Sequence, residues 1–553
     1  MRTHRGRTDA GIGISWGNSP PKRRLPIAIL AATATVAGTG VASANTITGT
    51  TYDPTYVPTS MYRATVSTGA RNFWKSGYTG KGVDVAIIDT GVDAVQGLDA
   101  PGKVIQGPDL SFDSKDALTL HKDGYGHGTH LAGIIAGSDD SIFAYSRMKM
   151  SVNNSAAFYG MAPSARIVSV KVGAVNGAVD VTQVIAGLNW IVQHKNDNGM
   201  NIRVVTLAYS TDGHQDYRTD PLTFAVENAW NNGITVVTAA GNAGRNKNGS
   251  GPGLMNPAYD PFVISVGAQD ARGTTDLTDD RVADFSSNGP TDWDGRAPDV
   301  VAPGVSVPSL RVVGSYLDAN YGGTAVVGTR FFKGSGSSQA AAMVAGAAAL
   351  IISRNPAATP DDVKSLLRKS AVTLSNEPSG SQGTGRVALD RILAGTVAPD
   401  GDQIGDPATG SGSVELSRGT HHLAINGDEL NGDVDIFGNP FNGTAAALAA
   451  NNLVAWNGGS WNGSSWTGSS WTGSSWTGSS WTGSSWTGSS WTGSSWTGSS
   501  WTGSSWTGSS WTGSSWTGSS WTGSSWTGDT WASALPPKKS PLKVQMVRRP
   551  KKR

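Results

Sequence analysis

Three short segments of the sequence carry residue types that could together cleave an acyl bond. Asp89 closes the apolar run of residues 83–88. His127 lies between two glycines directly before a run of small residues, and Ser338 lies in a glycine- and serine-rich turn before a second such run. Asp, His and Ser in this chain order match one of the known orders of a catalytic triad. In such a triad the serine attacks, the histidine carries its proton and the aspartate orients the histidine.

Each of these residues also has an ordinary structural explanation. An aspartate at a strand end often stabilises the turn that follows. A histidine in a glycine-rich turn is often a hydrogen-bonded surface residue. A serine before a helix is usually an N-cap. The combination of all three types, in one order and with these neighbours, favours catalysis over the separate explanations.

From residue 77 to residue 393 the chain resembles the subtilisin-like serine peptidases, the subtilases. Besides the three segments, the resemblance rests on Val-Thr-Ala-Ala-Gly-Asn at 237–242, Asn-Pro-Ala at 256–258, Val-Ile-Ser-Val-Gly-Ala at 263–268, Phe-Ser-Ser-Asn-Gly at 285–289 and Pro-Asp-Val-Val-Ala-Pro-Gly at 298–304. It implies a triad of Asp89, His127 and Ser338, with the side-chain amide of Asn242 in the oxyanion hole.

The turn that holds the serine departs from the pattern usual in that family. Ser337 stands where a threonine is usual, and Ala-Met at 342–343 stands where Pro-His is usual. Because Ser335 and Ser337 crowd the same turn, the choice of Ser338 rests on its spacing to Ala-Gly at 345–346.

The resemblance also places a substrate pocket with uncharged walls. The residues it implies there are Ala208, Tyr209, Ser210, Ala239, Ala240, Gly241 and Met255. It further implies a cis peptide at Asn256-Pro257. Because none of the pocket residues is charged, we expect apolar side chains to be preferred before the cleaved bond. Ser210 stands where a glycine is common and could narrow the cleft.

Strand patterns alternate with helix patterns between residues 82 and 393. Apolar runs at 83–88, 167–172, 203–208, 234–237 and 263–266 predict buried strands. Asp180 with Gln183 three residues later predicts a capped helix start, and a second helix is expected around 224–230. This alternation predicts an α/β fold with a mostly parallel central sheet flanked by helices, which is also the subtilisin-like architecture, followed by a low-complexity C-terminal extension.

The expected organisation has six parts. These are a signal peptide (1–44), a short N-terminal arm (45–69), a subtilisin-like peptidase domain (70–395), a linker and small segment (396–455), a Trp-x-Gly-Ser-Ser pentad repeat (456–531) and a basic tail (532–553). The signal rests on basic residues at 22–24, an apolar run at 25–41 and Ala-Ser-Ala at 42–44. Its alternative is a membrane anchor. A chain that ends near residue 400 is expected to hydrolyse small peptides still.

Composition excludes several function classes. The chain has no cysteine, so it has neither a disulfide framework nor thiolate metal ligands. Its 43 basic and 41 acidic residues are unevenly spread, and residues 45–537 hold 29 basic and 40 acidic residues. An acidic body with basic ends is not typical of a nucleic-acid-binding domain.

No cofactor is needed for the predicted chemistry, and no metal-binding residue is assigned. Structural calcium is frequent in the family, but no compact ligand motif supports it here.

Tryptophan recurs at every fifth position from Trp456 to Trp531, which accounts for 16 of the 21 tryptophans. Three interpretations stay open: a disordered Gly/Ser-rich extension, a surface whose indoles stack on glycan rings of the cell wall, and a repeated β-structure. The basic tail could bind anionic polymers or be a solvated end. The repeat and the Asp-Ile-Phe-Gly segment at 435–438 resemble a subgroup of secreted bacterial subtilases, mainly from high-GC Gram-positive bacteria.

Together these features predict a secreted serine endopeptidase that acts on proteins and peptides, with an extracellular and in part cell-wall-associated location. The competing hypothesis is a catalytically inactive subtilase scaffold that displays the tryptophan repeat as a binding or structural protein at the cell surface. The complete set of Asp89, His127, Ser338 and Asn242 favours the enzyme.

Overall fold

The computed structural model describes residues 53–115, 118–140, 154–244, 253–289, 296–457, 459–465 and 544–549, together with the backbone of the strands between residues 470 and 531. An eight-stranded sheet forms its centre, in the order β2-β3-β1-β4-β5-β6-β7 with β8 beside β6. The strands are β1 (Asp84–Asp89), β2 (Val104–Asp109), β3 (Arg166–Lys171), β4 (Ile202–Leu207), β5 (Thr235–Ala239), β6 (Ile264–Asp270), β7 (Arg281–Val282) and β8 (Val300–Pro303). Every pairing in this sheet is parallel except that of β6 with β7, which confirms the predicted mostly parallel sheet.

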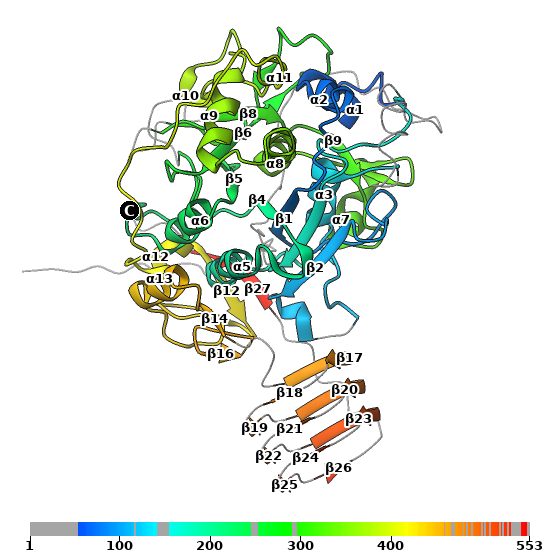
Figure 1. The fold of residues 1–553 in the computed structure, drawn as a ribbon, viewed down its shortest axis with the longest axis vertical. Coiled ribbons are helices and arrows are strands. Elements are labelled where there is room, and N and C mark those ends of the chain that lie inside the picture. Colours follow the sequence, from blue (N-terminus) through cyan, green and yellow to red (C-terminus); the bar gives the residue numbers. More distant parts are fainter. Residues whose placement is uncertain are drawn as a thin grey trace, which may run out of the picture.

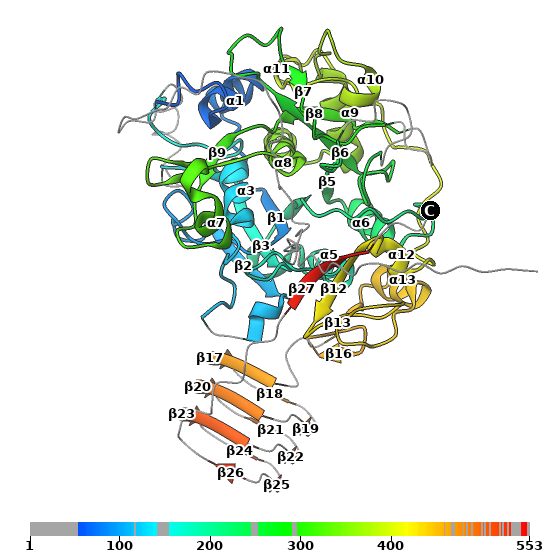
Figure 2. The same cartoon turned by 180° about the vertical axis from the view of Figure 1, so that it is seen from behind.

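Helices cover both faces of the sheet, as Figures 1 and 2 show. Helices α3 (His127–Ala136) and α8 (Ser337–Arg354) pack on one face, and α5 (Val181–His194) and α6 (Pro221–Asn231) pack on the other. Further helices in the described residues up to 395 are α1 (Met61–Ser67), α2 (Ala70–Lys75), α7 (Tyr316–Ala325), α9 (Pro360–Ser370), α10 (Ser379–Gln382) and α11 (Asp390–Leu393). A small antiparallel sheet of β9 (Val307–Leu310), β10 (Val326–Val327) and β11 (Phe331–Gly334) lies beside them.

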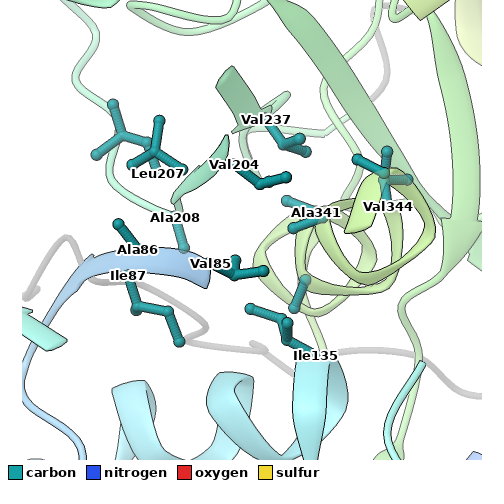
Figure 3. Close-up of a cluster of buried hydrophobic side chains, with 14 of the residues drawn as sticks. Val85, Ala86, Ile87, Ile135, Val204, Leu207, Ala208, Val237, Ala341 and Val344 are labelled. Atoms are coloured by element: carbon teal, nitrogen blue, oxygen red, sulfur yellow. The ribbon is translucent and has the colours of Figure 1, made fainter. Parts of the chain in front are cut away.

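The small residues of α8 let this helix lie at the centre of the body. Its residues from Ser337 to Ile352 are all buried. Figure 3 shows Ala341 of α8 beside Val85 of β1 and Val204 of β4. A side chain at Gly346 would come within 2.4 Å of the Met161 Cβ, so the helix can approach its neighbours only without one there.

The predicted start of one helix is confirmed by its capping contacts, and the second expected helix has a cap of its own. Asp180 and Gln183 form a reciprocal capping box at the start of α5. At the start of α6, the Asp220 carboxylate accepts hydrogen bonds from the backbone N–H groups of Leu222 and Thr223. Gly233 has a φ of 79°, a left-handed conformation that suits glycine. A residue in this conformation cannot continue the helix, so α6 ends before β5 begins.

The packed body continues past residue 395, into the segment expected to be a linker. It contains α12 (Val414–Arg418), β12 (His421–Ile425), β13 (Asp428–Glu429), α13 (Gly443–Asn451), β14 (Trp456–Asn457), β15 (Ser460–Trp461) and β16 (Ser464–Ser465). Near the C-terminus, β27 (Val544–Arg548) pairs antiparallel with β12, so this part of the basic tail is held in a sheet. Arg549 contacts Glu429 at 2.6 Å and Glu415 at 3.2 Å.

Between residues 470 and 531, the strands of the tryptophan repeat pair with a constant offset of 20 residues, which is four pentads. The first stack is β17 (Ser470–Gly478), β20 (Ser490–Gly498), β23 (Ser510–Gly518) and β26 (Thr530–Trp531), and all its pairings are parallel. Two shorter stacks have the same offset: β18 (Trp481–Thr482), β21 (Trp501–Thr502) and β24 (Trp521–Thr522), and β19 (Ser485–Thr487), β22 (Ser505–Thr507) and β25 (Ser525–Thr527). Of the three interpretations, the repeated β-structure is the one that matches this register.

The proposed signal peptide and the first part of the N-terminal arm lie outside the described residues, as does most of the basic tail. In the part of the chain that the structure describes, no helix combines the length and apolar character that crossing a bilayer requires.

Candidate active site

Asp89 and His127 lie in direct contact at one edge of the central sheet. Asp89 is the last residue of β1, and His127 is the first residue of α3. The His127 Nδ1 lies 2.9 Å from Asp89 Oδ1 and 3.0 Å from Asp89 Oδ2, and both side chains are at most 2% exposed. The carboxylate therefore accepts from the Nδ1–H, which leaves Nε2 as the acceptor of the ring. This is the tautomer that a general base requires.

The glycine after His127 lets α3 approach β1 closely enough for that contact. A Cβ at Gly128 would lie 2.1 Å from the Gly91 carbonyl oxygen and 3.2 Å from the Asp89 Cβ. Any larger residue would push the helix away from the strand and lengthen the contact between His127 and Asp89.

The start of α3 is fixed by Asp123, a buried residue that the sequence analysis did not single out. Its carboxylate accepts from the backbone N–H of Gly126 and of Thr129, both at 2.7 Å, and from the Thr90 hydroxyl at 2.7 Å. Asp123 therefore connects the turn after β1 with the first turn of α3. An acid shortly before a helix start is a capping signal, and that signal could have identified it.

The charge of Asp89 controls the protonation of His127. Burial of the imidazole disfavours its cation, but the Asp89 carboxylate, by charge and by hydrogen bond, favours it more. The His127 pKa therefore lies above its ordinary value of 6.5. Among the described residues, the buried His127 Nε2 has no hydrogen-bond partner.

The second histidine of α3 has different surroundings. His130 Nε2 lies 3.2 Å and 3.0 Å from the carbonyl oxygens of Val307 and Phe332. Burial, with the neighbouring His127, lowers the His130 pKa to about 4, so it stays neutral at physiological pH.

The three serines of the turn before α8 have distinct partners. The Ser335 hydroxyl accepts from the Ser306 N–H at 2.8 Å. The Ser337 hydroxyl accepts from the Gly241 N–H at 3.1 Å and donates to Asn242 Oδ1 at 3.0 Å. The Ser338 hydroxyl has no such bond within the described part of the chain. Among the described residues, Ser338 is thus the one of these three serines whose hydroxyl makes no such bond, which suits a nucleophile.

Asn242 is tied to the first turn of α8 by its side-chain oxygen. The Ser337 backbone N–H, which can only donate, lies 2.9 Å from Asn242 Oδ1. This contact orients the amide, because Oδ1 must point toward Ser337. The Nδ2 group therefore points away from the Ser337 N–H, as an oxyanion-hole donor should.

Part of the expected pocket comes together beside this amide. The Ser210 hydroxyl lies 3.7 Å from Met255 Sδ, and the Met255 N–H donates to the Ala240 carbonyl at 3.0 Å. Gly241 has a φ of 107°, and a Cβ there would lie 2.5 Å from the Met255 Cγ. Ser210, Ala240, Gly241 and Met255 thus form one group at the carboxyl ends of β4 and β5. The peptide between Asn256 and Pro257 is cis, as expected.

The other expected pocket residues are buried within the body. Ala208, Tyr209 and Ala239 are 3–4% exposed. Burial raises the pKa of the Tyr209 hydroxyl well above its ordinary value, in keeping with a side chain in the core.

Among the described residues, no three histidine, aspartate or glutamate side chains gather as a metal site would require.

The chain is similar to several known proteins. A model of the subtilase family (Peptidase_S8) matches residues 80–385. The chain is similar to serine protease AprX of Bacillus subtilis (strain 168), with 36% identity over 338 residues, which cover 60% of this chain and 71% of AprX. It is also similar to subtilisin E of the same organism, with 33% identity over 300 residues, covering 54% of this chain and 63% of subtilisin E. Among solved structures, a cold adapted subtilisin-like serine proteinase matches with 26% identity and a TM-score of 0.41, covering 56% of this chain and 90% of that protein.

Proposed function

This chain belongs to the subtilase family, and from that premise we propose that it cleaves peptide bonds with a triad of Ser338, His127 and Asp89. Its family shows that the chain is a serine-type endopeptidase. The proposal therefore concerns which residues carry out catalysis and in which compartment the enzyme works. The observation that carries it is the buried contact between Asp89 and His127, which leaves His127 Nε2 as the acceptor of the ring.

The first half of the reaction forms an acyl-enzyme. As Ser338 Oγ attacks the carbonyl carbon of the scissile bond, His127 Nε2 accepts the hydroxyl proton. The negative charge that develops on the carbonyl oxygen is stabilised by the Ser338 N–H at the start of α8 and by the Asn242 amide. His127 then protonates the leaving amine as the C–N bond breaks. Subtilases need no cofactor for this chemistry.

The second half returns the enzyme to its starting state. His127 accepts a proton from water, and the resulting hydroxyl attacks the ester carbonyl. The bond to Ser338 Oγ then breaks, and His127 returns the proton to that oxygen. Asp89 keeps its charge throughout and stabilises the imidazolium that forms in each half.

A covalent serine probe tests the proposal directly. A fluorophosphonate should label the protein at Ser338, because only an activated serine displaces fluoride from the phosphorus. Mass spectrometry of the digested protein identifies the modified residue. Absence of labelling would support the rival hypothesis of an inactive scaffold, and labelling at Ser337 would move the nucleophile by one residue.

The raised pKa of His127 leads to a prediction of the pH dependence. His127 must be neutral to accept the serine proton, so activity is lost as the pH falls through its pKa. Since that pKa is raised, we expect kcat/KM for a peptide p-nitroanilide to rise through an apparent pKa above 6.5 and to stay high in alkaline solution. A profile measured at constant ionic strength with its optimum near pH 4 would contradict this.

The proposal includes an extracellular location and a preference for apolar substrate side chains before the cleaved bond. The first is supported by the export-signal pattern of residues 1–44 and the second by the uncharged group of Ser210, Gly241 and Met255. Contact of residues 456–553 with wall glycans or anionic polymers is supported by their tryptophan and basic content.

A further inference from the structure

Residues 408–457 and 459–465, with strand β27, pack against the loop that directly follows the pocket residue Ser210. We call this segment the C-terminal module, and it begins after the end of the family match at residue 385. A Cβ at Gly213 would lie 2.4 Å from the Ser417 carbonyl oxygen, and a Cβ at Gly419 would lie 2.5 Å from Asp212 Oδ1. The two backbones therefore meet where neither glycine could carry a side chain.

Hydrogen bonds join the module to this loop. The Thr211 hydroxyl donates to the Ser417 carbonyl oxygen. The Thr420 N–H and hydroxyl donate to the two oxygens of the Asp212 carboxylate, each at 2.7 Å. Thr211 and Asp212 are at most 6% exposed, so these contacts are shielded from water.

A second route from the module to the pocket runs through the buried carboxylate of Asp220. The Ser417 hydroxyl donates to Asp220 Oδ2 at 2.9 Å, and the Asn256 Nδ2 donates to the same oxygen at 2.8 Å. Asp220 is fully buried and also caps α6. The module, the start of α6 and the residue after Met255 thus share one carboxylate.

Both routes end at the pocket. Thr211 and Asn256 exchange two backbone hydrogen bonds of 3.1 Å. The residues just before them, Ser210 and Met255, are the pair whose side chains meet at 3.7 Å. The backbone positions of Ser210 and Met255 are therefore set by neighbours that the module holds.

Arg418 anchors the module beside Ser417. Its side chain is 1% exposed, and its Nε lies 2.9 Å and 3.0 Å from the two carboxylate oxygens of Asp180, at the start of α5. Its remaining nitrogens donate to the carbonyl oxygens of Gly432 and Val434. A buried ion pair with all these bonds holds α12 in one place.

We propose that the C-terminal module positions the substrate pocket through Ser417, and so sets which side chain is accepted before the cleaved bond. Ser417 is a positioning residue, since it acts through Thr211, Asp220 and Asn256. The inference rests on the proposed function, which assigns the pocket to Ser210 and Met255. It also revises the expectation for a chain ending near residue 400, which would lose these contacts and should not keep the same pocket.

The test compares Ser417→Ala with the unchanged full-length protein on tetrapeptide p-nitroanilides that differ only in having Ala, Leu or Phe before the cleaved bond. Loss of the hydroxyl should change the Phe-to-Ala ratio of kcat/KM by about threefold or more, mainly through KM, with kcat on the Ala peptide nearly unchanged. The matched control is Ser464→Ala. Ser464 is 6% exposed, and its hydroxyl bonds to Asp435 within the module rather than to Asp220. The control should lower thermal stability without changing the ratio.

A second variant keeps the test decisive if Ser417→Ala does not fold. Thr211→Val preserves the side-chain shape and removes the hydroxyl that donates to the Ser417 carbonyl and accepts from the Gly213 N–H at 3.3 Å, and the same change of ratio is expected. An unchanged ratio in an active, folded variant, or an equal change in Ser464→Ala, would overturn the inference. If the unchanged protein cleaves none of the peptides, the proposed function itself fails, and the inference fails with it.

Discussion

Replacing Ser338 by alanine is expected to abolish peptide hydrolysis while leaving the fold intact. The hydroxyl is the proposed nucleophile, and it makes no hydrogen bond within the described part of the chain, so its removal disturbs little structure. In subtilisin, removal of the nucleophilic serine lowers kcat by about 10⁶-fold, and a loss of that order is expected here. Casein hydrolysis and fluorophosphonate labelling measure the loss, and circular dichroism with thermal unfolding checks the fold.

Ser337→Ala is the matched control, one residue away in the same turn. It removes the hydroxyl contacts with Gly241 and Asn242 but keeps the backbone N–H that orients the Asn242 amide. A neutral hydrogen bond contributes about 0.5–1.5 kcal/mol, so we expect activity to fall by about tenfold or less. If Ser337→Ala were the inactive variant and Ser338→Ala active, the assignment of the nucleophile would be wrong by one residue.

Asp89→Asn is expected to have the second largest effect. An asparagine can offer its NH₂ group to His127, and the ring would then present Nδ1 as acceptor and Nε2 as donor, the wrong tautomer for a base. In a serine protease with the same triad this change lowers kcat by about 10⁴-fold. We expect a loss of that order in kcat for a peptide p-nitroanilide, with a much smaller change in KM.

The pH profile of Asp89→Asn separates this explanation from simple unfolding. Asp89 raises the His127 pKa against the effect of burial, so without its charge the midpoint of the residual activity should move to lower pH. Asp216→Asn is a suitable control, because Asp216 pairs with Arg218 at the surface. That variant should leave both the rate and the midpoint unchanged, and a midpoint that stays in place in Asp89→Asn would contradict the proposed role.

The central sheet could be predicted from the sequence because its signals are local. The apolar runs at 83–88 and 167–172 became β1 and β3 within one residue at each end, and the capping box at Asp180 starts α5. Burial on both faces of a parallel sheet requires continuous apolar strands, and helix starts require side-chain caps, so each element carries its own pattern. The types and order of Asp89, His127 and Ser338 are read from the sequence in the same way.

The roles of the three serines before α8 depended on the tertiary structure. All three lie within four residues, and nothing in their spacing alone says which hydroxyl is already used. Ser335 bonds to Ser306, and Ser337 bonds to Gly241 and Asn242, residues that are distant in the chain. The position of Tyr209 in the core, rather than at the pocket surface, is likewise decided by what packs around it.

The sequence by itself determined the α/β class, the residue types and order of the proposed triad, and the five-residue period of the repeat, because each depends on residues that are close in the chain. Only the tertiary structure decided that the strands of the repeat pair four pentads apart and that the C-terminal module contacts the loop at 211–213 across about 200 residues of chain. Such contacts leave no periodic pattern. They form because the folded body brings distant backbones together, and the loop-closure cost of doing so grows only slowly with the length of chain between them.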